Sequence, residues 1–328
     1  MSIKPHDRLQ AALSEDLTRV NVLIRERMAS EHAPRIPEVT AHLVEAGGKR
    51  VRPMLTLAAA GICGYAGPYH VHLAATVEFI HTATLLHDDV VDESEQRRGR
   101  PSANLLWDNQ SSVLVGDYLF ARAFQLMTEP ERIDALRVLS NAAATIAEGE
   151  VLQLTAASNL ATTEETYLKV VRGKTAALFS AATEVGAMIA DAPRDVVRAF
   201  FDYGDALGVS FQIADDILDF GGVTAQTGKN IGDDFRERKL TLPLIKAIAQ
   251  ADDEERDFWK RTIEKGQQEE GDLETCLALL KKYGALEAAR AEAFDWVEKA
   301  KAALTGVPDH AMKDMLSDLA DYVVARIN

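Results

Sequence analysis

Cysteine is scarce in this sequence, and no apolar segment is long enough to cross a membrane. The 328 residues contain two cysteines, Cys63 and Cys276, which form no CxxC motif and are too few for a disulfide scaffold. No uninterrupted apolar run reaches the roughly 18 residues that a spanning helix needs. The first residues also lack the apolar region of a signal peptide. We therefore expect a soluble protein of the reducing cytoplasm.

Basic residues are outnumbered, with 36 Lys and Arg against 51 Asp and Glu and a formal net charge of −15. A general nucleic-acid binder depends on many phosphate contacts from Lys and Arg, so this balance argues against one. Any anion site must therefore be local. The apolar fraction of 47% is enough for a substantial core in a chain of this length.

Alternating polar and apolar segments, typical of strands, are also missing, whereas helical periodicity is present from the start. Near the amino terminus one apolar stripe predicts an amphipathic helix that contains Leu9, Leu13, Leu17, Val20 and Ile24. Later helical runs are separated by short clusters of Pro, Gly and capping residues, and none has the composition of a flexible linker. We predict an all-α protein with a single domain over residues 1–328.

Two acidic clusters share one pattern, in which Asp-Asp-x-x-Asp follows an apolar run. They occur in "LLHDDVVDE" at residues 85–93 and in "FQIADDILDF" at residues 211–220. Helix positions three and four apart share a face, so each cluster crowds its carboxylates together and suits a hard cation such as Mg²⁺. A lone copy is more often a solvated helix face, but two copies beside apolar runs indicate a metal site. The candidate ligands are Asp88, Asp89, Asp92, Asp215, Asp216 and Asp219.

Tight groups of bases stand close to these acids, notably in "GGKRVRP" and "QRRGRP". Each group taken alone is more often a solvated surface patch. In an acidic chain, however, bases beside metal-binding carboxylates indicate a focused diphosphate site. The candidates are Lys49, Arg50, Arg52, Arg97, Arg98, Arg100, Lys174, Lys229 and Lys239.

Two histidines lie near the first acidic cluster. His81 stands seven residues before Asp88, close to two helical turns, so we expect it on the same side of the helix. On spacing alone, a satisfied core or surface histidine is the commoner explanation for His81. The same explanation applies to His87, which directly precedes the cluster.

At these residues the sequence resembles the trans-type polyprenyl diphosphate synthases. The matching motifs follow in order from roughly residue 45 to residue 245: "GGKRVRP", "EFIHTATLLHDDVVDESEQRRGRPSAN", "GDYLFARAF", "EGEVLQL", "RGKTAALFSAA", "GVSFQIADDILDF" and "GKNIGDDFRERKLTLPLI". The resemblance implies an antiparallel helical bundle around a deep central cavity, with the two aspartate motifs facing each other, and a homodimer. It also implies a prenyltransferase that joins isopentenyl diphosphate to an allylic diphosphate, farnesyl or geranyl diphosphate.

The resemblance assigns roles to individual residues. It implies that the aspartates bind two or three Mg²⁺ ions per active site, with Asp88, Asp92, Asp215, Lys174 and Lys229 as the catalytic set. Arg97, Lys174 and Lys229 would contact the allylic diphosphate, while Thr175 and Gln212 would line the allyl group. The isopentenyl diphosphate site would contain Lys49, Arg52, His81 and Arg98. The resemblance therefore favours a binding role for His81 over that of a satisfied core or surface histidine. Arg50, Arg100 and Lys239 match the motifs without a defined role.

In this family the residues one or two turns before the first aspartate form the wall beside which the product grows. Here they include Ile80, Ala83 and Thr84, and short-chain members carry bulky aromatics near the positions of Ala83 and Thr84. One helical turn of about 5.4 Å is similar to the length of one isoprene unit, so a small residue deepens the cavity by whole units. We expect a product of about eight to ten units, as in octaprenyl and decaprenyl diphosphate synthases that make quinone side chains.

Several alternatives remain open at this point. The small residues can simply pack helices closely, with the floor of the cavity near Leu126, Met127 or Leu154, which would allow a farnesyl or geranylgeranyl diphosphate synthase. A class I terpene cyclase has no need for a second diphosphate site, and a non-catalytic partner subunit tends to lose the first aspartate motif. An acidic helical interaction protein would not be stabilised by Mg²⁺ and a diphosphate. A transient membrane contact for product release is a further expectation.

Overall fold

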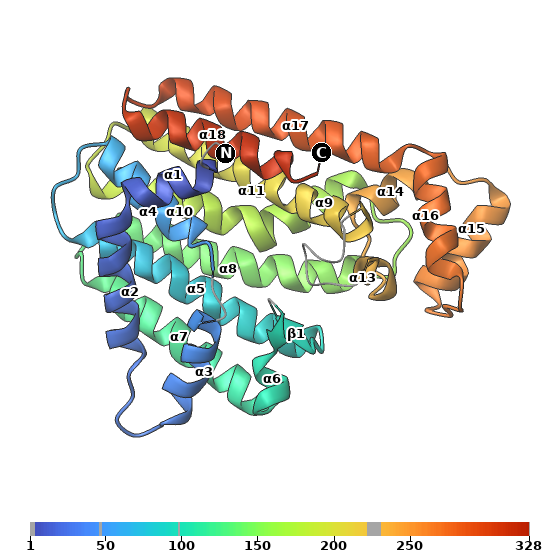
Figure 1. Ribbon diagram of the computed structural model, residues 1–328, viewed down its shortest axis with the longest axis horizontal. Coiled ribbons are helices and arrows are strands. Elements are labelled where there is room, and N and C mark those ends of the chain that lie inside the picture. Colours follow the sequence, from blue (N-terminus) through green and yellow to red (C-terminus); the bar gives the residue numbers. More distant parts are fainter. Residues whose placement is uncertain (1–3, 46–47, 98, 222–230, 328) are drawn as a thin grey trace. The chain divides into compact units, whose positions relative to one another are not determined.

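A computed structural model describes residues 4–45, 48–97, 99–221 and 231–327, and most of them are helical (Figure 1). The predicted all-α class is therefore confirmed. The chain divides into two compact units, each assembled from three separate segments. Unit 1 comprises Met1–Ala143, Leu178–Gly204 and Ala303–Asp318, and unit 2 comprises Ala144–Ala177, Asp205–Ala302 and Leu319–Asn328. The single domain over residues 1–328 stays a prediction.

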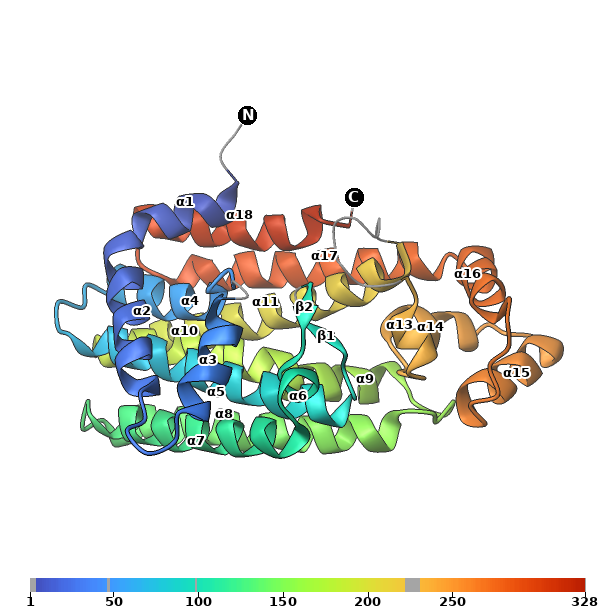
Figure 2. The ribbon, with the colours of Figure 1, turned by 60° about the horizontal axis from the view of Figure 1, so that its bottom comes forward.

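Unit 1 contains the amino-terminal helices and a short hairpin. Its complete helices are α1 (Pro5–Ala12), α2 (Ser14–Met28), α3 (Arg35–Glu45), α4 (Val51–Ile62), α5 (Tyr69–Val91), α6 (Ala103–Leu106), α7 (Asn109–Thr128) and the short 3₁₀ helix η3 (Leu304–Gly306). The hairpin pairs β1 (Gln96–Arg97) with β2 (Arg100–Pro101) in antiparallel register, and Figure 2 shows it beside α6.

Unit 2 contains helices from the second half of the chain. Its complete elements are α9 (Glu164–Val171), the π-helical turn η1 (Arg172–Ala176), α13 (Asp233–Arg236), α14 (Leu242–Ile248), α15 (Asp253–Trp259), the π-helical turn η2 (Lys260–Glu264) and α16 (Asp272–Lys282). The division of the chain falls within or beside five longer helices: α8 (Ile133–Ala156), α10 (Ala177–Ile189), α11 (Arg194–Gly221), α17 (Ala285–Ala303) and α18 (Ala311–Ala325).

The predicted amino-terminal stripe is buried as expected, but the structure divides it between two helices. Leu9, Val20 and Ile24 are at most 2% exposed. The helix expected to be continuous breaks at Leu13, whose φ of −107° and ψ of 12° end α1. Acidic residues in the first turn of α2 favour a new helix start directly afterwards.

Helix α5 forms the centre of unit 1, where it packs against α7, α4 and α2 (Figure 1). Apolar residues occur around its whole circumference rather than on a single stripe, and this pattern is typical of a helix buried on all sides. The fold therefore places the carboxyl end of a buried helix at the first aspartate motif.

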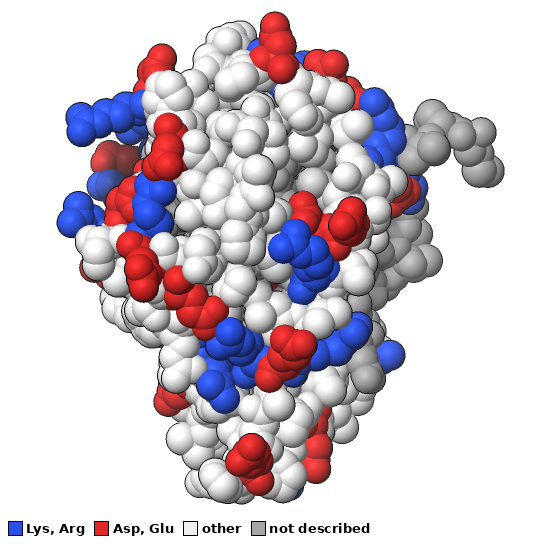
Figure 3. Space-filling model, turned by 90° about the vertical axis from the view of Figure 1, so that its left-hand side faces the viewer, with Lys and Arg blue, Asp and Glu red and all other residues white. Residues whose placement is uncertain are grey.

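The described part of the chain has no helix both long and apolar enough to span a bilayer. Figure 3 shows the face turned to the left in Figure 1, where acidic and basic side chains are intermixed around an uncharged area. The net negative charge is thus not gathered into a single acidic patch on this face.

Candidate active site

The first aspartate motif lies at the end of α5 in unit 1. The helix closes at Asp92, whose backbone N–H donates to the carbonyl of Asp88 at 2.8 Å. Asp88 and Asp92 are half-buried, whereas Asp89 is completely buried. Burial raises the pKa of the Asp89 carboxyl, although the nearby Arg97 guanidinium opposes the shift. The motif therefore combines two accessible carboxylates with one inside the protein.

The hairpin after α5 supplies the partner of Asp89. Arg97 donates from Nε and lies with Nη2 within 2.6 Å of Asp89 Oδ1, while the other oxygen, Oδ2, is buried and has no hydrogen-bond partner among the described residues. Gly99 makes the turn with a φ of +74°, a conformation that favours glycine. Arg97 is paired in register with the exposed Arg100. Arg98, predicted for the isopentenyl diphosphate site, lies outside the described residues.

Two residues predicted for the isopentenyl diphosphate site come together in unit 1. Arg52 Nη1 lies 3.3 Å from His81 Nε2, and the guanidinium stacks over the Phe179 ring at 4.4 Å. Lys49 is exposed three residues earlier, just before α4. Arg50 instead forms an ion pair with the buried Glu78, which indicates a structural role.

His87 fits the commoner explanation of a histidine that is satisfied by contacts within the protein, because it contacts α7. Its Nε2 atom lies 3.1 Å from the carbonyl oxygen of Val113 and 3.5 Å from an Asp117 carboxylate oxygen, both on α7. The ring also stacks on Phe120 with centroids 5.9 Å apart. These contacts join α5 to α7 and leave His87 outside the candidate site.

The second aspartate motif lies on α11 in unit 2, and its three carboxylates have different surroundings. Asp216 is 5% exposed, and its two oxygens accept hydrogen bonds from Tyr167 and Gln212 at 2.5 and 2.8 Å. Burial raises the pKa of Asp216 to about 7. Asp215 pairs with Arg326 at 3.0 Å, and Asp219 accepts the backbone N–H of Asp234 at 3.1 Å.

The two described bases predicted in unit 2, Lys174 and Lys239, each pair with a glutamate. Lys174 lies in the π-helical turn η1 and pairs with Glu150 of α8 at 2.9 Å. Thr175 donates to Gln212 Oε1 at 2.7 Å, so two residues predicted to line the allyl group are in contact. Lys239 pairs with Glu237 at 2.6 Å. Lys229 lies outside the described residues.

A close backbone contact fixes the position of Lys174. A Cβ atom added at Gly149 would lie 2.6 Å from the Lys174 backbone nitrogen, and one added at Gly173 would lie 2.8 Å from the Gly149 Cα. Only glycine therefore allows α8 and η1 to approach so closely. The π-helical turn itself is a feature that often occurs at functional sites.

We expect Gly149→Ala to displace Lys174 and to lower the melting temperature by several degrees. Activity should fall more than about tenfold, because positioning errors near a reacting group are costly. Gly221→Ala is the matched control, since an added Cβ there meets no atom of the described residues within 4 Å. Thermal unfolding and steady-state rates of both variants check this. Equal melting temperatures and rates for the two variants would contradict a role of the Gly149 contact in positioning Lys174.

The residues fit a cation that is shared with a phosphate ligand rather than enclosed by protein. Among the described residues, no three acidic, histidine or cysteine side chains are grouped closely enough to hold a metal ion on their own. The donor set is nevertheless made of hard carboxylate oxygens, and Asp89 Oδ2 is buried with no hydrogen-bond partner in the part of the chain that the structure describes. Mg²⁺ commonly keeps few carboxylate ligands and completes its shell with water and phosphate oxygens.

The residues predicted to set product length lie one to two turns before the first motif. Ile80 and Ala83 are completely buried, and the Thr84 hydroxyl donates to the carbonyl of His81 in its own helix at 2.8 Å. Of the alternative floor residues, Leu126 and Met127 are buried, whereas Leu154 is 58% exposed. Leu154 is thus on the surface of its unit rather than in an interior wall.

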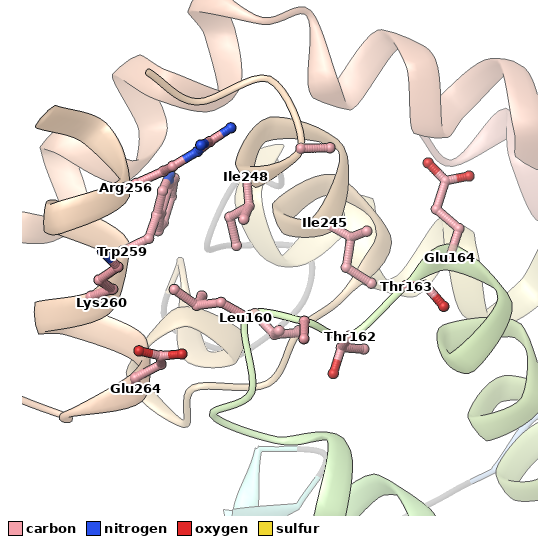
Figure 4. A pocket seen from close by; sticks show the side chains of 13 residues that line it. Leu160, Thr162, Thr163, Glu164, Ile245, Ile248, Arg256, Trp259, Lys260 and Glu264 are labelled. Atoms are coloured by element: carbon pink, nitrogen blue, oxygen red, sulfur yellow. The ribbon is translucent and has the colours of Figure 1, made fainter. Parts of the chain in front are cut away.

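A separate cavity of about 500 Å³ lies in unit 2 (Figure 4). Its walls come from the loop before α9, from α14 and from the α15–η2 segment, which contribute among others Leu160, Ile248 and Trp259. None of the described lining residues belongs to the predicted site.

Comparison with known proteins decides the family. The polyprenyl synthetase family model matches residues 33–280. The chain belongs to the polyprenyl synthetase family. It is 42% identical to octaprenyl diphosphate synthase of Escherichia coli over 320 residues, which cover 98% of each chain.

Solved structures of polyprenyl synthetases support the same assignment. A decaprenyl diphosphate synthase from Rhodobacter capsulatus is 71% identical, with a TM-score of 0.96 over 98% of this chain and 99% of that chain. A polyprenyl synthase from Caulobacter crescentus, complexed with calcium and isoprenyl diphosphate, is 49% identical, with a TM-score of 0.94 over 98% of each chain. The predicted family, the prenyltransferase class and the long-chain class are confirmed.

Three residues of this polyprenyl synthetase that contact the predicted set were not singled out from the sequence. Tyr167 and Arg326 bind aspartates of the second motif, and Glu150 binds Lys174. Glu150 lies within the quoted "EGEVLQL" motif, which was a usable signal. Tyr167 is 49 residues from its partner in the sequence, and Arg326 is more than 100 residues from its partner. Local spacing therefore gave no signal for either residue.

Proposed function

We propose that this polyprenyl synthetase is a Mg²⁺-dependent enzyme that adds isopentenyl diphosphate repeatedly to an allylic diphosphate. The proposed product has about eight to ten isoprene units, a length suited to quinone side chains. The main support is that both aspartate motifs are intact at helix positions beside clustered bases, in a chain similar to octaprenyl and decaprenyl diphosphate synthases. We also propose a cytoplasmic homodimer.

The residues divide into two diphosphate sites. Asp88, Asp92 and Asp215 would hold Mg²⁺, which when bound supplies positive charge that stabilises the departing diphosphate. Lys174 and Arg97 would hold the same allylic diphosphate, Arg97 being oriented by Asp89.

The second substrate has its own bases. Arg52 and His81 are already in contact, and with Lys49 they would hold the diphosphate of isopentenyl diphosphate. The allylic C–O bond breaks, the isopentenyl double bond forms the new C–C bond, and the released diphosphate can accept the lost proton. Positioning and charge stabilisation account for this reaction without a protein nucleophile.

Two features favour elongation over the alternatives. The Arg52–His81 pair supports a second diphosphate site, which a terpene cyclase does not need. The first aspartate motif is complete, which argues against a non-catalytic partner subunit.

Incorporation of labelled isopentenyl diphosphate into solvent-extractable product tests the proposal. We expect incorporation that requires both an allylic primer and Mg²⁺ and that is lost with a chelator. Product formed from the allylic diphosphate alone would instead indicate a cyclase.

Exposed apolar residues on α7 support the proposed homodimer. Val113, Leu114 and Phe124 are 39%, 67% and 45% exposed, and Val113 and Phe124 are about three helical turns apart on one face. Unpaired apolar surface of this kind is typical of protein interfaces.

We expect Leu114→Glu to convert the dimer to monomer, because a charge would be buried in the interface. Val22→Glu, at an apolar position that is 44% exposed on α2, is the control and should remain dimeric. Sedimentation velocity measures both, and a dimeric Leu114→Glu variant would place the interface elsewhere.

A further inference from the structure

The second aspartate motif contains a carboxylate that is fully engaged by the protein. The Tyr167 hydroxyl donates to Asp216 Oδ2 at 2.5 Å, and Gln212 Nε2 donates to Asp216 Oδ1 at 2.8 Å. Gln212 is held in turn by Thr175, whose hydroxyl donates to its Oε1 at 2.7 Å. Tyr167, Thr175 and Asp216 are each less than 10% exposed. With the half-buried Gln212, the four side chains form one continuous chain of hydrogen bonds.

Asp216 differs in burial from the other carboxylates of its motif. Asp215 and Asp219 are half-buried, whereas Asp216 is 5% exposed. A cation that binds Asp216 would have to enter a buried site in which each carboxylate oxygen already accepts a hydrogen bond, and if it displaced Tyr167 it would leave a buried donor without an acceptor, which is unfavourable. The surroundings of Asp216 therefore suit a fixed support better than a metal ligand.

The π-helical turn η1 makes this arrangement possible. Tyr167 and Thr175 are eight residues apart, which in a regular α-helix turns their side chains about 80° away from each other. A π-helical turn accommodates one extra residue, and this reduces the difference to about 20°. Both side chains consequently reach α11, where Gln212 and Asp216 are one turn apart.

We propose that Tyr167 is a positioning residue: its hydroxyl, together with Gln212 and Thr175, fixes Asp216 so that Asp215 and Asp219 are presented to the metal–diphosphate complex. This inference rests on the proposed function, and it removes Asp216 from the expected ligand set. Tyr167 acts through Asp216 and does not touch the substrate.

The test measures binding of Mg²⁺ by calorimetry in the presence of inorganic diphosphate, alongside turnover. We expect Tyr167→Phe to weaken the apparent Mg²⁺ affinity about fivefold to tenfold, because the removed hydroxyl no longer fixes Asp216. The Mg²⁺ concentration for half-maximal turnover should rise by a similar factor. The KM for isopentenyl diphosphate should stay within about twofold, since its proposed site uses other residues.

Tyr203→Phe is the matched control. Tyr203 is also completely buried, and its hydroxyl donates to the carbonyl of Leu316 at 2.8 Å within unit 1. Loss of this hydroxyl should lower the melting temperature and leave the Mg²⁺ affinity unchanged. The control separates general loss of stability from loss of positioning.

A second comparison separates a support from a ligand. Asp215→Asn should weaken Mg²⁺ binding more than about a hundredfold, whereas Asp216→Asn should weaken it less than about tenfold. The Tyr167→Phe/Asp216→Asn double variant should be no worse than Asp216→Asn alone, because both changes break the same link.

Two results would overturn the inference: a wild-type Mg²⁺ affinity in Tyr167→Phe, or an effect of Asp216→Asn as large as that of Asp215→Asn. Binding of Mg²⁺ in the presence of inorganic diphosphate needs no turnover, so failure of this inference can be distinguished from failure of the proposed function. A wild-type protein that binds Mg²⁺ and diphosphate but forms no prenyl product would refute the synthase proposal alone.

Discussion

Asp88→Ala is expected to lower turnover at least about a thousandfold while the protein stays folded. Asp88 is half-buried in the last turn of α5, so its loss opens no large cavity. The effect on the reaction is large because the carboxylate would help to hold the cations that stabilise the departing diphosphate. Rates measured across a Mg²⁺ series, with melting temperatures of each sample, check this expectation.

The control for Asp88 is another aspartate of unit 1. Asp202 lies on α11 with a side chain that is 45% exposed and pairs with Arg198 at 2.8 Å. Asp202→Ala removes the same charge from a surface ion pair and should keep near-wild-type turnover. Wild-type activity in Asp88→Ala would refute the assignment of the first metal site.

Ala83→Phe is expected to shorten the main product from about eight to ten units to about three or four. Ala83 is completely buried on α5, less than two turns before Asp88, so an aromatic ring there would block the proposed path of the growing chain. Total consumption of isopentenyl diphosphate should fall less than product length does, because the diphosphate sites are unchanged. Chromatography of dephosphorylated products measures the distribution.

Overpacking of the buried position must be distinguished from a blocked path. Ala83→Leu should give products of intermediate length, and Thr84→Val, which keeps the branched shape of the side chain, should leave the distribution unchanged. An unchanged distribution in a folded Ala83→Phe variant would place the floor elsewhere, with buried Leu126 or Met127 as the next positions to test.

Local pattern was enough for the features that depend on neighbouring residues. The stripe from Leu9 to Ile24 predicted a buried helical face because three-and-four spacing is a direct consequence of helix geometry. The aspartate motifs and the basic triplets were visible for the same reason, since their members lie within one or two turns. The family motifs assigned Arg52 and His81 to one predicted site, and the structure has the two side chains 3.3 Å apart.

Features that depend on distant residues or on small backbone changes were not predictable. The break at Leu13 leaves the apolar stripe uninterrupted, and the β1–β2 hairpin is too short to show alternation. The π-helical turn at Arg172–Ala176 changes the direction in which the Thr175 side chain points, and the amino-acid composition of the segment gives no sign of this turn. Tyr167 contacts Asp216 across 49 residues, so only the folded chain reveals that this aspartate is engaged.

The proposed synthase activity is tested most directly by chromatography of the products that the wild-type protein forms from farnesyl diphosphate and excess isopentenyl diphosphate with Mg²⁺. We expect a ladder of chain lengths whose final member has about eight to ten isoprene units, and no ladder with a chelator. A ladder that stops at three or four units would contradict the long-chain assignment, and absence of any elongated product with Mg²⁺ would contradict the synthase function itself.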